Sequence, residues 1–392
     1  MSLPERPLVE RRLLAAIDAS PSRIPVLVGG CGTGQTSLLL RLRELAGHGS
    51  AQYIDLEAIA TTPERCADAV KSASPFPPAG GDYPPADPRA AFELLLTHLD
   101  ASRAPGHEPA TFLIDGFLEF RTFENFPGLR HVVRDFIARI GESRNRFVLA
   151  SRYPARTLRV LRDAPARFEV MQLAPLSVPE VQASCGNGTG SAGRSHGRDG
   201  DETAASIQAL SAGRATYAAS LARALDTPAG AGRLDPMSAL VSLMAPGGEI
   251  AARCRQAFEL RLHRARGYGA LKAILSVLAE QEGLTLTEIA QRLRRTPGST
   301  KDYLSWLEDV DLVVSTRKRY TFEDPVLRLF VRLYAQPSPP SDEDVAREVH
   351  AFAMSRLPAS APPAAPEPAA QPAMAGAATG TDDRSWGIIE ID

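Results

Sequence analysis

The stretch GGCGTGQTS, residues 29–37, decides the fold and directly follows the apolar run IPVLV at 24–28. Gly29, Gly32, Gly34, Thr36 and Ser37 fit a phosphate-binding loop, in which glycines let the backbone curl and aim its N–H groups at phosphate oxygens. A helix N-terminus directly after the loop favours an anion through its dipole. A hydroxyl at position 36 suits magnesium. The stretch predicts a nucleotide site, and the loop alone leaves open a plain glycine-rich turn between a strand and a helix.

Position 35 departs from this pattern, because Gln35 stands where such a loop normally presents a lysine. A glutamine brings no positive charge, although its amide can donate hydrogen bonds to a phosphate. Losing a charged contact costs about 1.5–3 kcal/mol, which lowers the affinity about tenfold to a hundredfold. Hydrolysis suffers more, because negative charge has to be neutralised as the γ-phosphoryl group departs. We therefore expect ATP and Mg²⁺ to bind and ATP hydrolysis to be weak or lost.

The composition shows no strong overall charge. The chain has 392 residues, enough for two or three domains, with a formal net charge of −2 and a pI of about 6.4. No global basic field attracts nucleic acid, so any DNA contact has to come from a local patch. The cysteines, Cys31, Cys66, Cys185 and Cys254, have no metal-binding spacing and are typical of reduced thiols. No segment has the apolar length of a membrane helix or signal core, so we expect a cytoplasmic protein without membrane contact.

Strand-like and helix-like segments alternate through the first half of the chain. We expect strands at 24–28, 51–56, 110–116, 146–151 and 168–173, and helices from 36, around 92–99 and at 129–140. The helix from 36 carries a leucine stripe at Leu38, Leu39, Leu42 and Leu45. Apolar strands that alternate with helices are typical of a parallel sheet covered on both faces. The prediction is an α/β fold, a P-loop NTPase parallel sheet, with the nucleotide-binding domain at 1–178.

The composition changes after Pro179. We expect a helical lid at 179–265, interrupted by a flexible Gly/Ser-rich loop at 184–202, with helical pattern at 203–225 and 251–264. A winged-helix domain is expected at 266–335, with Thr287 capping its second helix. A C-terminal helix follows at 336–357, then a disordered Ala/Pro-rich linker at 358–383 and a terminal peptide at 384–392.

Acidic and basic residues stand at the carboxyl ends of two expected strands. Asp115 ends the third strand, which we expect next to the phosphate-loop strand, where a magnesium ligand belongs. Glu119 could orient an attacking water, and we count Asp115 and Glu119 as candidate catalytic residues. Arg152, after the fourth strand, could sense the γ-phosphate. A strand-ending turn at Asp115, a surface glutamate at 119 and an ordinary turn at 151–152 are the alternatives.

Several further segments repeat a family pattern. They are LIDGFLEF (113–120), VLASR (148–152), LAPLSVPEV (173–181), SAGRATYAASLARAL (211–225) and YTFEDPVLRLFVRLY (320–334). Through them the chain resembles the STAND branch of the AAA-type P-loop ATPases, close to the archaeal-type ATPase family, over roughly residues 5–335. Gln35, Leu118, Ala212 and Ala215 depart from the pattern, standing for a lysine, an acid, a glycine and a nucleotide-contacting proline. The departures that face the nucleotide suggest relaxed demand for hydrolysis.

The resemblance implies a nucleotide-dependent switch. ATP would close the lid and winged helix over the sheet, and ADP or an empty site would release them. Relatives serve in signalling, in defence against foreign genetic elements and in DNA-associated roles, so the resemblance indicates the switch better than the process it serves.

Two regions suggest partners. The winged helix offers Lys301, Arg317, Lys318 and Arg319 to DNA, although its second helix ends in the acidic LEDVD and presents few basic residues. The terminal peptide 386–392, which begins at Trp386, has the length and apolar character of a segment that docks on a partner protein.

The sequence thus supports a STAND-type ATP-binding switch or adaptor. The alternatives are a DNA-binding winged-helix regulator whose nucleotide domain is a scaffold, and a homo-oligomeric ATPase that takes its missing charge from a neighbouring subunit.

Overall fold

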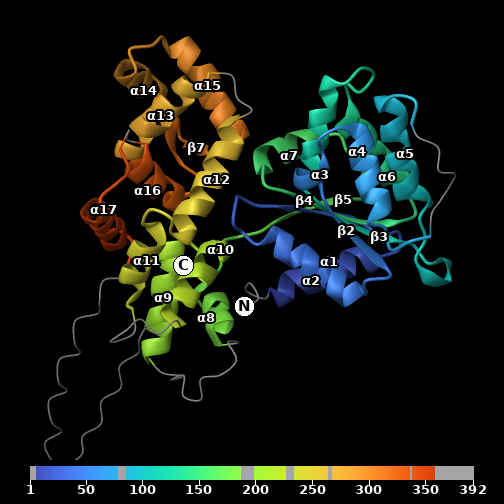
Figure 1. Ribbon diagram of the computed structural model, residues 1–392, viewed down its shortest axis with the longest axis horizontal. Coiled ribbons are helices and arrows are strands. Elements are labelled where there is room, and N and C mark those ends of the chain that lie inside the picture. The colour runs from blue at the N-terminus through green and yellow to red at the C-terminus, as the bar shows by residue number, and fades with distance from the viewer. Residues whose placement is uncertain are drawn as a thin grey trace, which may run out of the picture. The chain divides into compact units, whose positions relative to one another are not determined.

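A computed structural model of the chain describes residues 6–77, 85–186, 198–226, 234–263, 267–335 and 338–357 (Figure 1). The expected linker at 358–383 and the terminal peptide at 384–392 lie outside the described residues. No helix in the described part of the chain combines the length and apolarity needed to cross a lipid bilayer.

The first half of the chain builds a five-stranded sheet in the order β2-β3-β4-β1-β5, with every pair parallel. The strands are β1 (Ile24–Val28), β2 (Ala51–Asp55), β3 (Thr111–Asp115), β4 (Arg146–Ser151) and β5 (Phe168–Gln172). Each expected strand is present, with bounds within one residue at either end. The order differs in one respect, because β4 lies between β3 and β1. Asp115 therefore ends a strand that is separated from the phosphate-loop strand β1 by one strand, β4, and is not its direct neighbour as expected.

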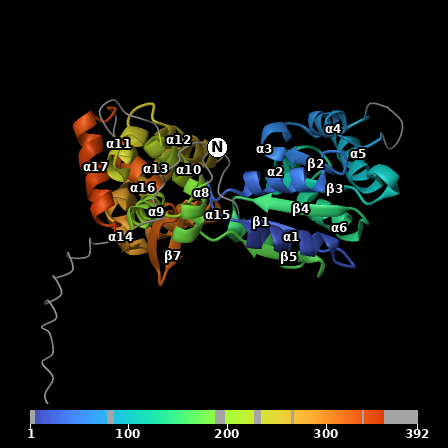
Figure 2. The ribbon, with the colours of Figure 1, turned by 90° about the horizontal axis from the view of Figure 1, so that it is seen from below.

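Helices cover both faces of this sheet, as Figures 1 and 2 show. One face packs against α1 (Pro7–Asp18) and α2 (Gln35–Ala46) through side chains such as Leu13 and Leu39. Leu38, Leu39 and Leu42 are buried as the leucine stripe predicts, whereas Leu45 near the end of α2 is 48% exposed. The other elements of this half are α3 (Leu56–Ile59), α4 (Pro63–Ser72), α5 (Pro88–Ala101), η1 (Pro105–His107), η2 (Phe117–Asn125), α6 (Val132–Glu142) and α7 (Pro154–Val160). On the opposite face, α4, α5, η2 and α6 bury aromatic and aliphatic side chains such as Phe92, Phe120 and Ile137.

Helices also follow the sheet. They are α8 (Val178–Gly186), α9 (Arg198–Ser211), α10 (Ala215–Asp226), α11 (Pro236–Met244) and α12 (Glu249–His263). The expected loop at 184–202 is too long at both ends, because α8 continues to Gly186 and α9 already begins at Arg198; residues 187–197 lie outside the described residues. The single helix expected at 203–225 is divided, because Gly213 adopts a left-handed φ of 66° between α9 and α10.

A module of helices and a small antiparallel sheet ends the described chain. It contains α13 (Tyr268–Glu280), β6 (Leu284–Thr285), α14 (Leu286–Arg292), α15 (Pro297–Asp309), β7 (Val313–Thr316), β8 (Arg319–Phe322), α16 (Pro325–Tyr334) and α17 (Asp342–Met354). The N-cap of α14 is Thr285 rather than Thr287, because Thr285 and Glu288 form a reciprocal capping box. β7 and β8 form a hairpin that turns at Arg317 and Lys318, both with positive φ.

One hydrophobic core joins this module to the helices before it. Buried side chains from α10, α11 and α12, such as Leu221 and Leu240, belong to the same cluster as Leu304 of α15 and Phe330 of α16. The boundary expected at residue 265 is therefore not a break in packing.

Candidate functional site

The loop between β1 and α2 forms a cradle of backbone donors. Gly32 and Gly34 have φ values of 81° and 94°, which glycine adopts without strain. Gly34 is the N-cap of α2 and has no side chain to cap the first turn. Within the described residues, the N–H groups of Gly32 and Gly34 donate to no protein acceptor. Open N–H groups at a helix N-terminus fit the phosphates of a nucleotide.

Thr36 and Asp115 meet beside this loop. The Thr36 hydroxyl donates to Oδ2 of Asp115 at 2.6 Å, and Asp115 is only 3% exposed. The Tyr53 hydroxyl on β2 donates to the same oxygen at 3.2 Å. Burial, and then the nearby charge of Asp115, raises the pKa of Tyr53, so it stays a protonated donor. A hydroxyl and a carboxylate are oxygen ligands of the kind that Mg²⁺ prefers.

Gln35 lies in the same turn but points into the sheet. Its amide nitrogen donates to the Ser151 carbonyl at 2.7 Å and to the Leu27 carbonyl at 3.3 Å, and the residue is 5% exposed. An amide nitrogen carries two hydrogens, and both are used here. In this arrangement Gln35 has no donor left for a phosphate.

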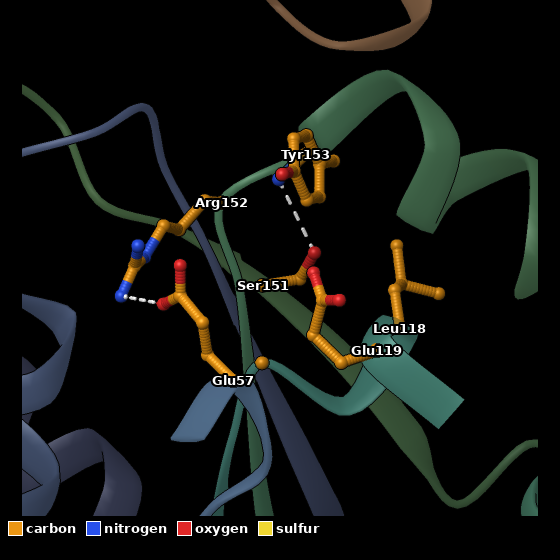
Figure 3. A pocket seen from close by; sticks show the side chains of 7 residues that line it. Glu57, Leu118, Glu119, Ser151, Arg152 and Tyr153 are labelled. Carbon is orange, nitrogen blue, oxygen red and sulfur yellow. Dashed lines mark hydrogen bonds and ion pairs between the residues drawn. The ribbon is translucent and has the colours of Figure 1, made fainter. Parts of the chain in front are cut away.

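A small pocket lies beside the ends of β3 and β4, and Figure 3 shows its lining. Arg152 forms an ion pair with Glu57 at 2.5 Å, and both are partly buried. Burial raises the pKa of Glu57, Arg152 lowers it, and the charge of Glu119 raises it further. Glu119 and Arg152 therefore line the same pocket, as expected for residues that follow two strands at one edge of the sheet. Glu57 lines this pocket as well, which the sequence did not predict.

Two further positions singled out in the sequence, Ser37 and Leu118, lie in different surroundings. Ser37 is partly buried in the first turn of α2, directly after Thr36. Leu118, which stands for an acid in the family pattern, is 4% exposed and belongs to the hydrophobic core. The pocket thus has one carboxylate from this segment, Glu119, where the pattern has two.

Residues just before and within α10 contact the loop from the other side. Arg214 donates to the Cys31 carbonyl at 2.6 Å, and the Thr216 N–H donates to the Gly32 carbonyl at 3.1 Å. A Cβ atom at Gly30 would lie 2.8 Å from Nη1 of Arg214, and one at Gly32 would lie 2.5 Å from Oγ1 of Thr216. Glycine at these two positions lets the segment approach the loop.

Asp324 holds Arg214 on its far side. Its Oδ2 lies 3.2 Å from Nε of Arg214 and accepts the Tyr217 hydroxyl at 3.0 Å. Burial lowers the pKa of Arg214, but the charge of Asp324, together with those of other nearby groups such as Glu323, outweighs the burial and the pKa rises. Arg214 therefore remains a cation between the loop and the start of α16.

The candidate DNA contacts lie in a different part of the fold, on α15 and the β7–β8 hairpin. Lys301, Arg317, Lys318 and Arg319 are all exposed. The acidic end of α15 is engaged, because Asp309 receives two hydrogen bonds from Arg159 of α7, at 2.6 and 3.2 Å.

Sequence reasoning missed Tyr53, Glu57, Arg214 and Thr216. Tyr53 and Glu57 could have been found, because Tyr53 lies within β2 and Glu57 shortly after it, and β2 pairs with the strand that carries Asp115. Arg214 and Thr216 lie in the segment 211–225, where the family pattern draws attention only to Ala215. Only tertiary contacts bring Arg214 and Thr216 to the loop.

Comparisons with known proteins address the fold. No protein-family model and no curated protein matches the chain. The solved Walker-type ATPase Paby2304 of Pyrococcus abyssi is similar, with 15% sequence identity and a TM-score of 0.59, over 84% of this chain and 95% of that one. The RuvB Holliday junction branch migration motor of Thermotoga maritima matches with 14% identity and a TM-score of 0.40, over 81% and 92%. The parallel sheet, the glycine loop after β1 and the likeness to the Walker-type ATPase show that this chain has a P-loop ATPase fold.

Proposed function

We propose that the chain is a cytoplasmic, STAND-type switch that binds ATP with Mg²⁺ and hydrolyses it weakly or not at all. The observation that carries the proposal is the 2.6 Å hydrogen bond between Thr36 and Asp115 beside the glycine loop. This contact supports the proposal because a hydroxyl and a carboxylate of the kind that suits a metal lie together beside the N-terminus of α2, where phosphates are favoured.

The residues divide the ligand between them. The open N–H groups of Gly32, Gly34 and the first turn of α2 would hold the phosphates, and Gly29 leaves room for the Thr33 hydroxyl, which a Cβ atom would meet at 2.7 Å. Thr36 and Asp115 would hold the metal. Glu119 and Arg152 line the neighbouring pocket, where they could respond to the terminal phosphate. ATP carries one more phosphate, and therefore more negative charge, than ADP. Glu119 and Arg152 would respond to this difference in charge.

Weak hydrolysis follows from position 35. Gln35 has no charge and uses both amide hydrogens within the sheet, so it does little for the departing γ-phosphoryl group. If lysine is what the site lacks, Gln35→Lys raises both the affinity for Mg-ATP and the turnover. No change in either quantity would contradict this reading of position 35.

Binding is tested by equilibrium dialysis of ATP with and without Mg²⁺, using Gly34→Asp and the matched control Gly49→Asp. Gly34 has a left-handed φ in the loop, whereas a Cβ at Gly49 meets nothing within 4 Å. Native protein and Gly49→Asp are expected to bind ATP, and Gly34→Asp to lose it. Native protein without Mg-ATP binding, or Gly34→Asp that binds normally, contradicts the proposal.

The partner is proposed to be a protein that recognises the terminal peptide from Trp386 onward. Deleting residues 384–392 should abolish its capture without changing the melting temperature. An unchanged set of captured proteins would remove the peptide from the account. A homo-oligomer that completes the site in trans predicts instead a specific turnover that rises with protein concentration.

DNA binding is the second candidate, favoured by the exposed hairpin tip with Arg317, Lys318 and Arg319. It predicts salt-sensitive retention on DNA that survives Gly34→Asp and falls in Arg317→Ser/Lys318→Ser. Retention that is absent in the native protein, or unchanged in the double variant, contradicts it.

A further inference from the structure

Arg214 places a buried positive charge against the phosphate loop. Its side chain is 7% exposed, and Nη1 donates to the Cys31 carbonyl at 2.6 Å. The contact is close enough that any side chain at Gly30 would collide with Nη1. The loop that lacks a cation at position 35 thus has one at its outer edge, supplied by the segment that leads into α10.

The same guanidinium also contacts the C-terminal module. Nη2 donates to the Glu323 carbonyl at 3.1 Å, and Nε lies 3.2 Å from Oδ2 of Asp324. Asp324 is itself fixed, because its Oδ1 accepts from the N–H groups of Val326 and Leu327 at the start of α16. Arg214 therefore connects the loop with the first turn of α16.

The guanidinium has donors to spare for a further anion. Among the described residues, hydrogen bonds use two of its five N–H groups, one each on Nη1 and Nη2, while Nε forms the ion pair with Asp324 and Nη2 lies 3.9 Å from Oε1 of Glu323. An arginine suits phosphate because its planar fork can present two parallel N–H groups. Because Arg214 and Asp324 are both buried, a negative charge arriving at the loop acts on their ion pair with little screening by solvent.

The following proposal about Arg214 rests on the proposed nucleotide binding. We propose that Arg214 supplies the charge that Gln35 lacks, and that bound phosphates and Asp324 compete for its guanidinium. Nucleotide at the loop weakens the contact between Arg214 and Asp324 and so loosens α10 from the start of α16. By linkage, weakening that contact first must strengthen nucleotide binding by the same factor.

A double-mutant cycle at positions 214 and 324 tests this step, with the Kd for Mg-ATP from calorimetry as the readout. Asp324→Asn keeps an N-cap residue on α16 while removing the charge. We expect Asp324→Asn to tighten binding several-fold in the native background and to have no effect in an Arg214→Gln background. Arg214→Gln alone should weaken binding about tenfold.

Matched controls separate this step from general charge effects. Asp235→Asn makes the same change at the exposed N-cap of α11, and Arg223→Gln removes a cation from α10 where it pairs with Glu249. Both should leave the Kd unchanged. If Arg214→Gln does not fold, the Kd values of Asp324→Asn and Asp235→Asn for Mg-ATP still test the proposal, because only Asp324→Asn is expected to bind more tightly.

The outcomes are distinct. An Asp324→Asn effect that is equal in both backgrounds, or equal to that of Asp235→Asn, overturns the step. So does an unchanged Kd in Arg214→Gln. These results leave nucleotide binding itself intact, whereas a native protein that binds no Mg-ATP removes the proposed function and this step with it.

Discussion

At the scale of single residues, Gln35 joins two neighbouring strands. Its amide hydrogens satisfy the carbonyls of Leu27 on β1 and Ser151 at the end of β4, in a place that is 5% exposed. A buried carbonyl that loses its donor costs about 1–3 kcal/mol. The residue that departs from the phosphate-loop pattern therefore has a structural role of its own.

Replacing Gln35 by alanine removes both hydrogen bonds. We expect Gln35→Ala to lower the free energy of unfolding by about 1–3 kcal/mol in urea denaturation. Gln291→Ala, at an exposed position of α14, is the matched control and should change it by no more than about 0.5 kcal/mol. Equal losses in the two variants would show that the contacts of Gln35 contribute nothing specific.

At the scale of elements, the sequence predicts best where burial controls the pattern. The strands are continuous apolar runs such as IPVLV, and their bounds are correct within a residue. Strand order depends on crossovers that no single run encodes, so the position of β4 between β3 and β1 was missed. The extents of α8 and α9 were missed because glycine and serine near their ends are typical of a loop.

The residues of the candidate site are also partly predictable from the sequence and partly not. Thr36 and Asp115 were predicted because Thr36 follows one recognisable strand and Asp115 ends another, and the structure brings their side-chain oxygens to 2.6 Å. The cap of α14 shows how a local signal can be misplaced by two residues: Glu288, three positions after Thr285, completes the capping box. Arg214 could not be predicted, because its contacts with Cys31 and Asp324 span 183 and 110 positions of the chain.

Asp311 lies in the turn between α15 and β7, beside α7 and α12. Arg261 of α12 donates to its backbone carbonyl at 3.4 Å, and within the described residues Oδ2 has no hydrogen-bond partner. Burial raises the pKa of Asp311 to about 7, although the charges of Arg261 and Arg156 lower it and that of Glu323 raises it. A carboxyl with a raised pKa stabilises the folded state when protonated. That contribution is complete below about pH 4 and is lost as the pH rises to about 7.

Asp311→Asn removes this dependence on pH. Asparagine tolerates the left-handed φ of 51° found there. At about pH 8 we expect the variant to raise the free energy of unfolding by about 1–2 kcal/mol, less than the full pKa shift gives, because the carboxyl is partly exposed. The gain should be smaller at about pH 5. Urea denaturation at both pH values measures it, and a gain independent of pH would contradict the assigned ionisation.

At the scale of the whole molecule, the loop and the C-terminal module are connected through α10. Thr216 and Arg214 contact the loop, and Leu221 of α10 belongs to the core that extends into α15 and α16. A ligand at the loop would therefore act on an element that is packed into the C-terminal module. This arrangement supports the proposed nucleotide-dependent switch, which would need binding but no hydrolysis.

The central claim is that Thr36 and Asp115 hold the metal of a bound nucleotide. Titration calorimetry of Mg-ATP into the native protein, Thr36→Val and the matched control Thr316→Val tests it most directly, because Thr316 is exposed on β7. The account predicts that the native protein and Thr316→Val bind alike, while Thr36→Val binds at least about tenfold more weakly. Absence of binding to the native protein, or equal binding by Thr36→Val, would contradict it.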